Sequence, residues 1–200
     1  MTFFQSYLLH SISKYIFYIM QRDKKYLTSH SYSNNVSHYY LTTHRVYMQK
    51  VGLFLLLDMN SQFKLCVDAV GSDFPSKRDR FFLYYNLLSL SNGLRVFLSC
   101  STNELEKVPS MVAIHSCVSW YEREIWDMYG IHFDGHPDLR RILTDYGFQG
   151  HPLRKDFPLS GFLELYYNER LNSIVYHPVS LVQEFRNFDT ASPWDYISNY

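Results

Sequence analysis

The sequence predicts an α+β fold: a small, mostly antiparallel sheet of three to four strands with helices on one face, followed by an extended C-terminal tail. Three observations predict it. Short runs of β-forming residues are separated by turn residues between positions 37 and 100. An apolar stripe with helical spacing follows between 109 and 130. The remaining residues are rich in Gly and Pro.

Four runs carry strand signals. They are 37–43, 63–70, 80–89 and 95–100. The second run stops at Gly71, and the last two flank Asn92-Gly93, a pair that favours the positive φ angles of a tight hairpin turn. Residues 45–57 carry enough apolar neighbours for a buried helix, with a strand as the alternative on so short a run.

A long helix is expected between Pro109 and Gly130. Proline suits the first turn of a helix, and glycine suits the left-handed conformation that ends one. Between them, apolar residues recur at spacings of three and four. These are Met111, Ile114, Val118, Tyr121, Ile125 and Met128.

Both ends of the chain differ from this domain. The first twenty residues place Phe4, Leu8, Ile12, Ile16 and Ile19 on one face of an amphipathic helix, and a polar linker follows. At the other end, Gly and Pro forbid long regular elements, and a tail without a core of its own must gain its order from a partner. We therefore expect an N-terminal helix and linker (1–36), an α/β domain (37–131) and a docking tail (132–200).

Composition excludes several classes of function. The 19 basic and 19 acidic side chains balance, which leaves no electrostatic footprint for nucleic acid or anionic lipid. The three cysteines are far apart and lack the spacing of a disulfide framework, a zinc site or an iron–sulfur cluster. The N-terminal segment matches neither an import presequence nor a secretory signal, and no apolar run is long enough for a membrane span.

Residues 120–158 concentrate charge, aromatic rings, Gly and Pro, which indicates an active site or a protein interface. His132, Asp134, His136 and Asp138 alternate as metal ligands would, but Gly135 and Pro137 break the strand that would align them. No nucleophile elbow, metalloprotease motif or phosphate loop is present, so a metal-dependent hydrolase remains only an alternative.

An interface is the better interpretation, because the acids and bases of this stretch are interleaved. Arg123 and Asp127 are four residues apart and predict an ion pair along one helix face. Two further basic pairs follow His-Pro dipeptides close to aspartates, as in bidentate carboxylate pairing. The candidate interface residues are Glu122, Arg123, Glu124, Asp127, His136, Asp138, Arg140, Arg141, His151, Arg154, Lys155 and Asp156.

The stretch WYEREIWDMYGIHFDGHPDLRRILTDYGFQGHPLRKDFPLSG resembles the signature of the 30-kDa subunit of respiratory complex I, the proton-pumping NADH:ubiquinone oxidoreductase. That subunit is called subunit 9 when mitochondrial DNA encodes it. The elements ERE, DMYG, HPDLRRIL and GHPLRKDFP all match, and the resemblance covers about residues 37–195. The equivalent subunit of a plastid or cyanobacterial ferredoxin-driven quinone reductase carries a similar signature and is the alternative.

The resemblance implies a subunit that itself binds no flavin, iron–sulfur cluster or metal and carries no catalytic residue. The whole complex holds FMN and iron–sulfur clusters, oxidises NADH and reduces ubiquinone. The implied partners are the 49-kDa subunit and the adjacent iron–sulfur subunits of the quinone module. The implied location is the matrix side of the mitochondrial inner membrane, without a membrane span, and the chain would be made in the organelle.

Overall fold

The computed structural model describes residues 11, 14–16, 18, 29–33 and 38–188. It divides into two compact units, Met1–Phe157 and Pro158–Tyr200. Positions 11, 14–16 and 18 are helical, Ile16 is buried, and the Tyr15 hydroxyl donates to Asp58 Oδ1 at 3.1 Å. The remaining positions of the expected N-terminal helix, among them Phe4, Leu8, Ile12 and Ile19, lie outside the described residues.

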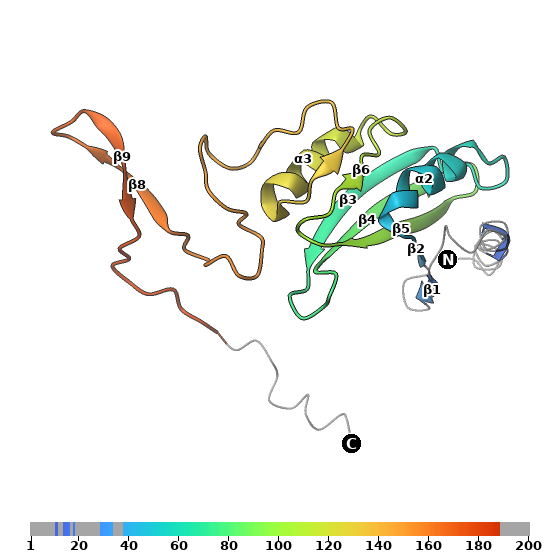
Figure 1. The fold of residues 1–200 in the computed structure, drawn as a ribbon, viewed down its shortest axis with the longest axis horizontal. Helices are drawn as coiled ribbons and strands as arrows, with labels where there is room; N and C mark the ends of the chain where they lie inside the picture. The colour runs from blue at the N-terminus through green and yellow to red at the C-terminus, as the bar shows by residue number, and fades with distance from the viewer. Residues whose placement is uncertain (1–10, 12–13, 17, 19–28, 34–37, 189–200) are drawn as a thin grey trace, which may run out of the picture. The chain divides into compact units, whose positions relative to one another are not determined.

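The first unit is built on a mixed sheet with the strand order β1-β2-β5-β4-β3 (Figure 1). The strands are β1 (Ser29–Ser33), β2 (His38–Thr42), β3 (Leu65–Asp73), β4 (Phe81–Ser89) and β5 (Leu94–Thr102). The pair β2–β5 is parallel and the other pairs are antiparallel. The sheet thus has one strand more than the three to four expected. The extra strand, β1, has the polar sequence SHSYS, which lacks the apolar alternation that identifies a strand.

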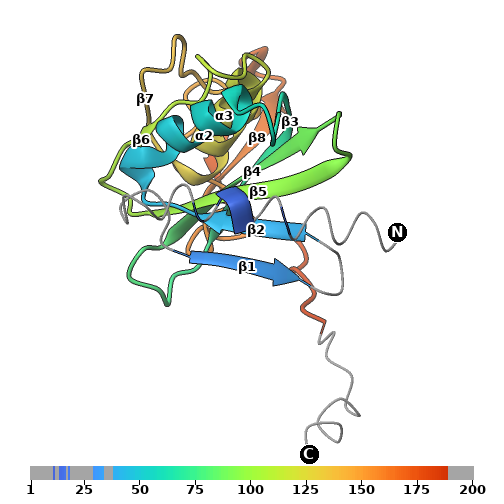
Figure 2. The same cartoon turned by 90° about the vertical axis from the view of Figure 1, so that its right-hand side faces the viewer.

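Helices cover one face of this sheet. The predicted helix after β2 is confirmed as η1 (Arg45–Tyr47) and α2 (Met48–Leu57), and α3 (Val118–Tyr129) lies on the same side (Figure 2). Alternate residues of β4, from Phe81 to Ser89, are buried, as a half-covered strand requires. The strand expected to stop at Gly71 continues to Asp73. A Cβ at Gly71 would stand 2.9 Å from the Tyr129 ring, so the glycine permits close packing of α3 instead of ending β3.

The long helix predicted from Pro109 is wrong in its first half. Pro109 belongs to the short strand β6 (Val108–Pro109), which pairs in parallel with β7 (Phe133–Asp134), and α3 begins only at Val118. Met111 is buried against Gly52 of α2, where a Cβ would meet its Cε at 2.2 Å. The helical spacing of 111–117 therefore reflects packing of a turn segment. The predicted left-handed end at Gly130 is confirmed, with φ 75° and ψ 27°.

The second unit contains an antiparallel hairpin, β8 (Leu163–Asn168) and β9 (Ser173–Pro178). The sequence forbids only long regular elements in this part of the chain, and each strand of the hairpin has six residues. Gly161 precedes the hairpin, Pro178 is the last residue of β9, and Asn172 takes the positive φ of 48° that its turn requires. No helix in the described part of the chain is long and apolar enough to cross a membrane.

Candidate functional site

Asp127 of α3 is the centre of the candidate site, and its side chain is fully buried. Its Oδ2 accepts hydrogen bonds from the backbone N–H groups of residues 142–144, at 2.8–3.2 Å. Its Oδ1 accepts from the Thr144 hydroxyl at 2.7 Å and from Arg141 Nη1 at 3.1 Å. Burial alone would raise the pKa of Asp127, but the bonds from Thr144 and from these backbone groups outweigh it and lower the pKa below 3.8. The carboxylate therefore stays ionised and folds residues 141–144 around itself.

The end of α3 is capped by the segment that follows, which we call the strap (residues 136–157). A helix leaves its last carbonyls without partners inside the helix. Here the strap binds three of them in succession: His151 Nδ1 lies 3.0 Å from the Asp127 carbonyl, the Leu153 N–H donates to that of Met128, and Arg154 Nε donates to that of Tyr129 at 2.7 Å. The motif GHPLR thus caps the C-terminal end of α3.

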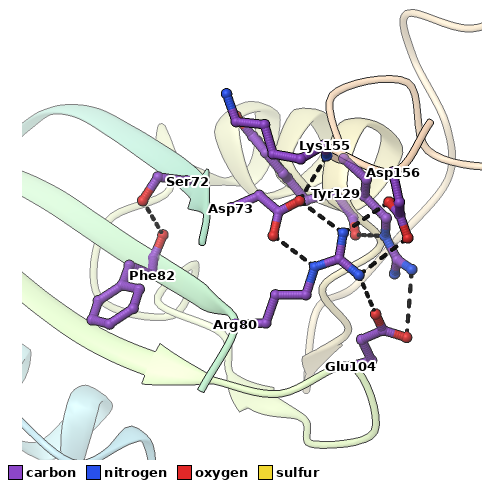
Figure 3. A network of polar contacts seen from close by, with 9 residues as sticks. Ser72, Asp73, Arg80, Phe82, Glu104, Tyr129, Lys155 and Asp156 are labelled. Carbon is purple, nitrogen blue, oxygen red and sulfur yellow. Dashed lines mark hydrogen bonds and ion pairs between the residues drawn. The ribbon is translucent and has the colours of Figure 1, made fainter. Parts of the chain in front are cut away.

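A second charge cluster ties the strap to the sheet (Figure 3). Arg80 makes a bidentate ion pair with Asp73, at 2.6 and 2.8 Å, across the β3–β4 loop. Its remaining donors reach Glu104 at 2.7 Å and Asp156 at 2.8 Å. Asp73 also accepts the backbone N–H of Lys155 at 2.7 Å. The Arg80 guanidinium lowers the pKa of Asp73, whose side chain is fully buried.

Glu122 forms a separate buried cluster on the inner face of α3. Its carboxylate accepts from the Ser110 hydroxyl at 2.6 Å, the Met111 N–H at 2.8 Å and the Tyr85 hydroxyl at 3.2 Å. His136 Nε2 lies 3.9 Å away, with its side chain equally buried. Burial raises the pKa of Glu122 despite these bonds. The cluster fixes the turn that precedes α3 against the sheet.

The ion pair predicted between Arg123 and Asp127 does not form. Arg123 donates to the carbonyl of Arg140 at 3.2 Å and stacks on Trp120, 4.9 Å from its ring centre, while Asp127 pairs with Arg141. The physical reason is the backbone N–H groups of 142–144, which hold the Asp127 carboxylate on the side of the strap.

Some of the predicted site residues hold the strap, and others are exposed to solvent. Asp127, Arg141, His151, Arg154 and Asp156 join the strap to α3 and the sheet. Glu124 and the side chain of Lys155 are exposed, and Arg140 and Asp138 form an exposed ion pair at 2.9 Å. His132 and Asp134 are also exposed, whereas His136 faces Ser119 and Glu122. Within the described residues, no group of three potential ligands is arranged to hold a metal ion.

Sequence reasoning missed Asp73, Arg80, Glu104 and Thr144. Asp73 and Arg80 stand at the two ends of the β3–β4 loop, and Glu104 follows β5, so no local spacing connects them with the strap. No local spacing marks Thr144 either, because its hydroxyl donates to Asp127, 17 residues earlier in the chain.

The buried carboxylates Asp73, Glu122 and Asp127 each have fixed hydrogen-bond partners, and Asp73 and Asp127 hold the strap in place. Comparison with known proteins then gives the family. Residues 41–163 match the family model described as respiratory-chain NADH dehydrogenase, 30 Kd subunit. The chain belongs to this family. It therefore functions as a subunit of an NADH:quinone oxidoreductase, and no catalytic role of its own follows from the membership.

Individual members of the family are close relatives. The chain is 49% identical over 155 residues to an NADH-quinone oxidoreductase subunit of Paramagnetospirillum magneticum, covering 78% of each protein. It is 46% identical over 166 residues to NADH-ubiquinone oxidoreductase subunit 9 of Prototheca wickerhamii, covering 82% of this chain and 86% of that one. It is 47% identical over 153 residues to NADH dehydrogenase [ubiquinone] iron-sulfur protein 3 of Beta trigyna, covering 76% and 80%. These names favour the respiratory enzyme over a ferredoxin-driven reductase.

The fold also occurs in a solved structure of low sequence identity. A chain in the structure of the membrane-bound sulfane sulfur reductase, an archaeal respiratory membrane complex, superposes with a TM-score of 0.60 at 21% identity. The match covers 75% of this chain and 85% of the other.

Proposed function

We propose that the chain is a structural and assembly subunit of the hydrophilic, quinone-module arm of the proton-pumping NADH:ubiquinone oxidoreductase. In this proposal it binds no cofactor and supports electron transfer from NADH to ubiquinone by holding subunits of the quinone module in place. Its partners are the 49-kDa subunit and the adjacent iron–sulfur subunits of the quinone module. It is peripheral on the matrix side of the mitochondrial inner membrane and is made in the organelle.

The hairpin of the second unit carries the proposal. One face of it consists entirely of apolar side chains in three opposed pairs: Leu163 with Pro178, Leu165 with Tyr176, and Tyr167 with Ile174. The five of these other than Pro178 are 51–68% exposed. The opposite face carries the Glu164–His177 contact at 3.6 Å. A two-stranded hairpin is marginally stable alone in water, so a face of this kind is stabilised by a partner.

The charged candidates have a supporting role in this proposal. Asp127, Arg141, His151, Arg154 and Asp156 fold the strap that leads to the hairpin, and the exposed Glu124, Asp138, Arg140 and Lys155 are left for contact with partner subunits. Exposed charges of this kind select the partner and the register of binding more than they add affinity.

The hairpin proposal is tested by Leu165→Glu, which places a charge on the apolar face. We expect less of the chain in the assembled complex on native gels, and proportionally less NADH:ubiquinone reductase activity, because burying an unpaired carboxylate is strongly unfavourable. The matched control is Ser173→Glu, on the other face of the same hairpin. Equal assembly of the two variants would contradict docking through this face, and a stoichiometric metal or flavin in the purified chain would contradict the structural role.

A further inference from the structure

The face of the sheet turned away from α2 and α3 carries a shallow groove of about 340 Å³. Strands β2, β3, β4 and β5 all contribute to its lining, which consists of Tyr40, Asp68, Val70, Tyr84, Asn86 and Phe97. The β4 residues of this face are half-buried, whereas those beneath the helices are buried. The groove is therefore on the less covered side of the sheet.

The strand register arranges these residues in a row across the sheet. Asp68 lies opposite Asn86, Asn86 opposite Phe97, and Phe97 opposite Tyr40. The rings of Tyr40 and Phe97 stack at 5.1 Å with an interplanar angle of 16°. The row thus carries polar side chains on β3 and β4 and aromatic side chains on β5 and β2.

Two oxygen acceptors of this row lack a donor. Asn86 Oδ1 is buried and accepts no hydrogen bond, and within the described residues no hydrogen bond or ion pair reaches the Asp68 carboxylate. A buried acceptor left without a donor is unfavourable, and native proteins keep few of them. Both groups would be satisfied by one ligand that carries several N–H donors.

A β-bulge sets the position of Asp68. The register of β3 against β4 shifts between Cys66 and Asp68, and the carbonyl of Val67 accepts from the Tyr121 hydroxyl of α3 at 3.1 Å. Bulges re-aim side chains and are frequent at functional sites. Here the bulge puts a carboxylate on the open face, directly opposite the unsatisfied amide oxygen.

We propose that this groove binds an arginine or lysine side chain of a neighbouring subunit. The cationic head lies between Asp68 and Asn86, and the aliphatic stem runs along the rings of Tyr40, Tyr84 and Phe97. Charge complementarity with Asp68 and the attraction of a cation to aromatic faces favour this occupant. The groove belongs to the first unit, and the hairpin belongs to the second. The inference rests on the chain's being held in an assembly, which the hairpin variants test independently.

The first test compares Asp68→Asn with Asp68→Glu in the assembled complex. The complex is purified through a tag on another subunit and washed in rising salt, and the retained chain is quantified by immunoblot. We expect about ten-fold weaker retention for Asp68→Asn, the loss typical of a charge-assisted hydrogen bond, and near wild-type retention for Asp68→Glu. Retention of Asp68→Asn equal to wild type would overturn the proposal.

The second test identifies the occupant. A photo-crosslinking amino acid at Val70, which lines the groove and is 49% exposed, is irradiated in the assembled complex. We expect a crosslink to a neighbouring subunit within a few residues of an arginine or lysine, whereas crosslinks confined to this chain, or to a segment without a basic residue, overturn the proposal.

The variant Asn86→Leu separates binding from folding. It removes the unsatisfied oxygen and keeps the branched shape of the side chain, so the full chain should keep or gain thermal stability while its retention in the complex falls. Unchanged retention would count against the proposal.

Discussion

At the scale of single residues, α3 carries two buried carboxylates whose environments shift their pKa values in opposite directions. Glu122 accepts one backbone N–H and two hydroxyls, and burial prevails, so its pKa is raised. Asp127 accepts three backbone N–H groups, a hydroxyl and a guanidinium, and its pKa is lowered. The number of donors, and not burial itself, decides whether the buried acid stays charged. The ionisation of Asp127 therefore makes the stability of the fold depend on pH.

The variant Asp127→Asn should flatten the pH dependence of stability in acid. Because the pKa of Asp127 is lower in the folded chain than the 3.8 of the unfolded one, its ionised form stabilises the fold above that value. This contribution is lost as the pH falls through 3.8 toward the folded pKa. Denaturation of the full chain between neutral pH and pH 3 should therefore show a shallower loss for Asp127→Asn than for wild type. The control is Asp138→Asn, which removes the carboxylate of an exposed ion pair instead of a buried one.

At the scale of elements, the junction between α3 and the strap depends on a glycine. Gly130 has φ 75°, and a Cβ there would lie 2.5 Å from His151 Nε2 and 2.6 Å from Arg154 Nη2. Gly135 has φ 76°, with nothing within 4 Å of the same position. The two sites share the backbone strain of a left-handed residue and differ only in the contact with the strap.

Comparing Gly130→Ala with Gly135→Ala isolates that contact. Both variants should lose about 1–2 kcal/mol of unfolding free energy to the left-handed conformation. Gly130→Ala should lose more, because it also displaces the side chains that cap α3. Urea denaturation of the full-length variants measures the difference. Equal losses would show that His151 and Arg154 move aside without consequence.

The sequence predicted elements well where burial and periodicity agreed. The β4–β5 hairpin and the end of α3 at Gly130 are confirmed, because alternation marks β4 and a left-handed glycine marks the helix end. The helix α2 is confirmed from its apolar residues alone. The predicted start of α3 at Pro109 is wrong, since the spacing of Met111 and Ile114 also suits a buried turn. The sequence predicted that charged residues gather in this stretch, but it did not predict which acid pairs with which base. Arg141, and not Arg123, pairs with Asp127, because backbone N–H groups donated from a distant loop decide the geometry.

At the scale of the whole molecule, the first unit is closed by charges that come from three distant parts of the chain. Arg80 joins the end of β3, the loop after β5 and the end of the strap through Asp73, Glu104 and Asp156 (Figure 3). The strap has few buried apolar residues of its own between 140 and 157, so polar contacts hold it in place. The Arg80 cluster is therefore the place where a single change should release the strap.

Arg80→Ala should release the end of the strap without unfolding the sheet. It leaves the buried Asp73 carboxylate with only the Lys155 N–H, a loss of roughly 3–5 kcal/mol when one partner of a buried ion pair is removed. Limited trypsin digestion of the full chain should therefore cut faster after Lys155, while circular dichroism of the sheet persists. Arg45→Ala is the control. Arg45 pairs with Glu106 in the loop after β5 and, among the described residues, makes no ion pair or hydrogen bond with the strap. Cleavage after Lys155 at the wild-type rate in Arg80→Ala would show that the helix cap alone holds the strap.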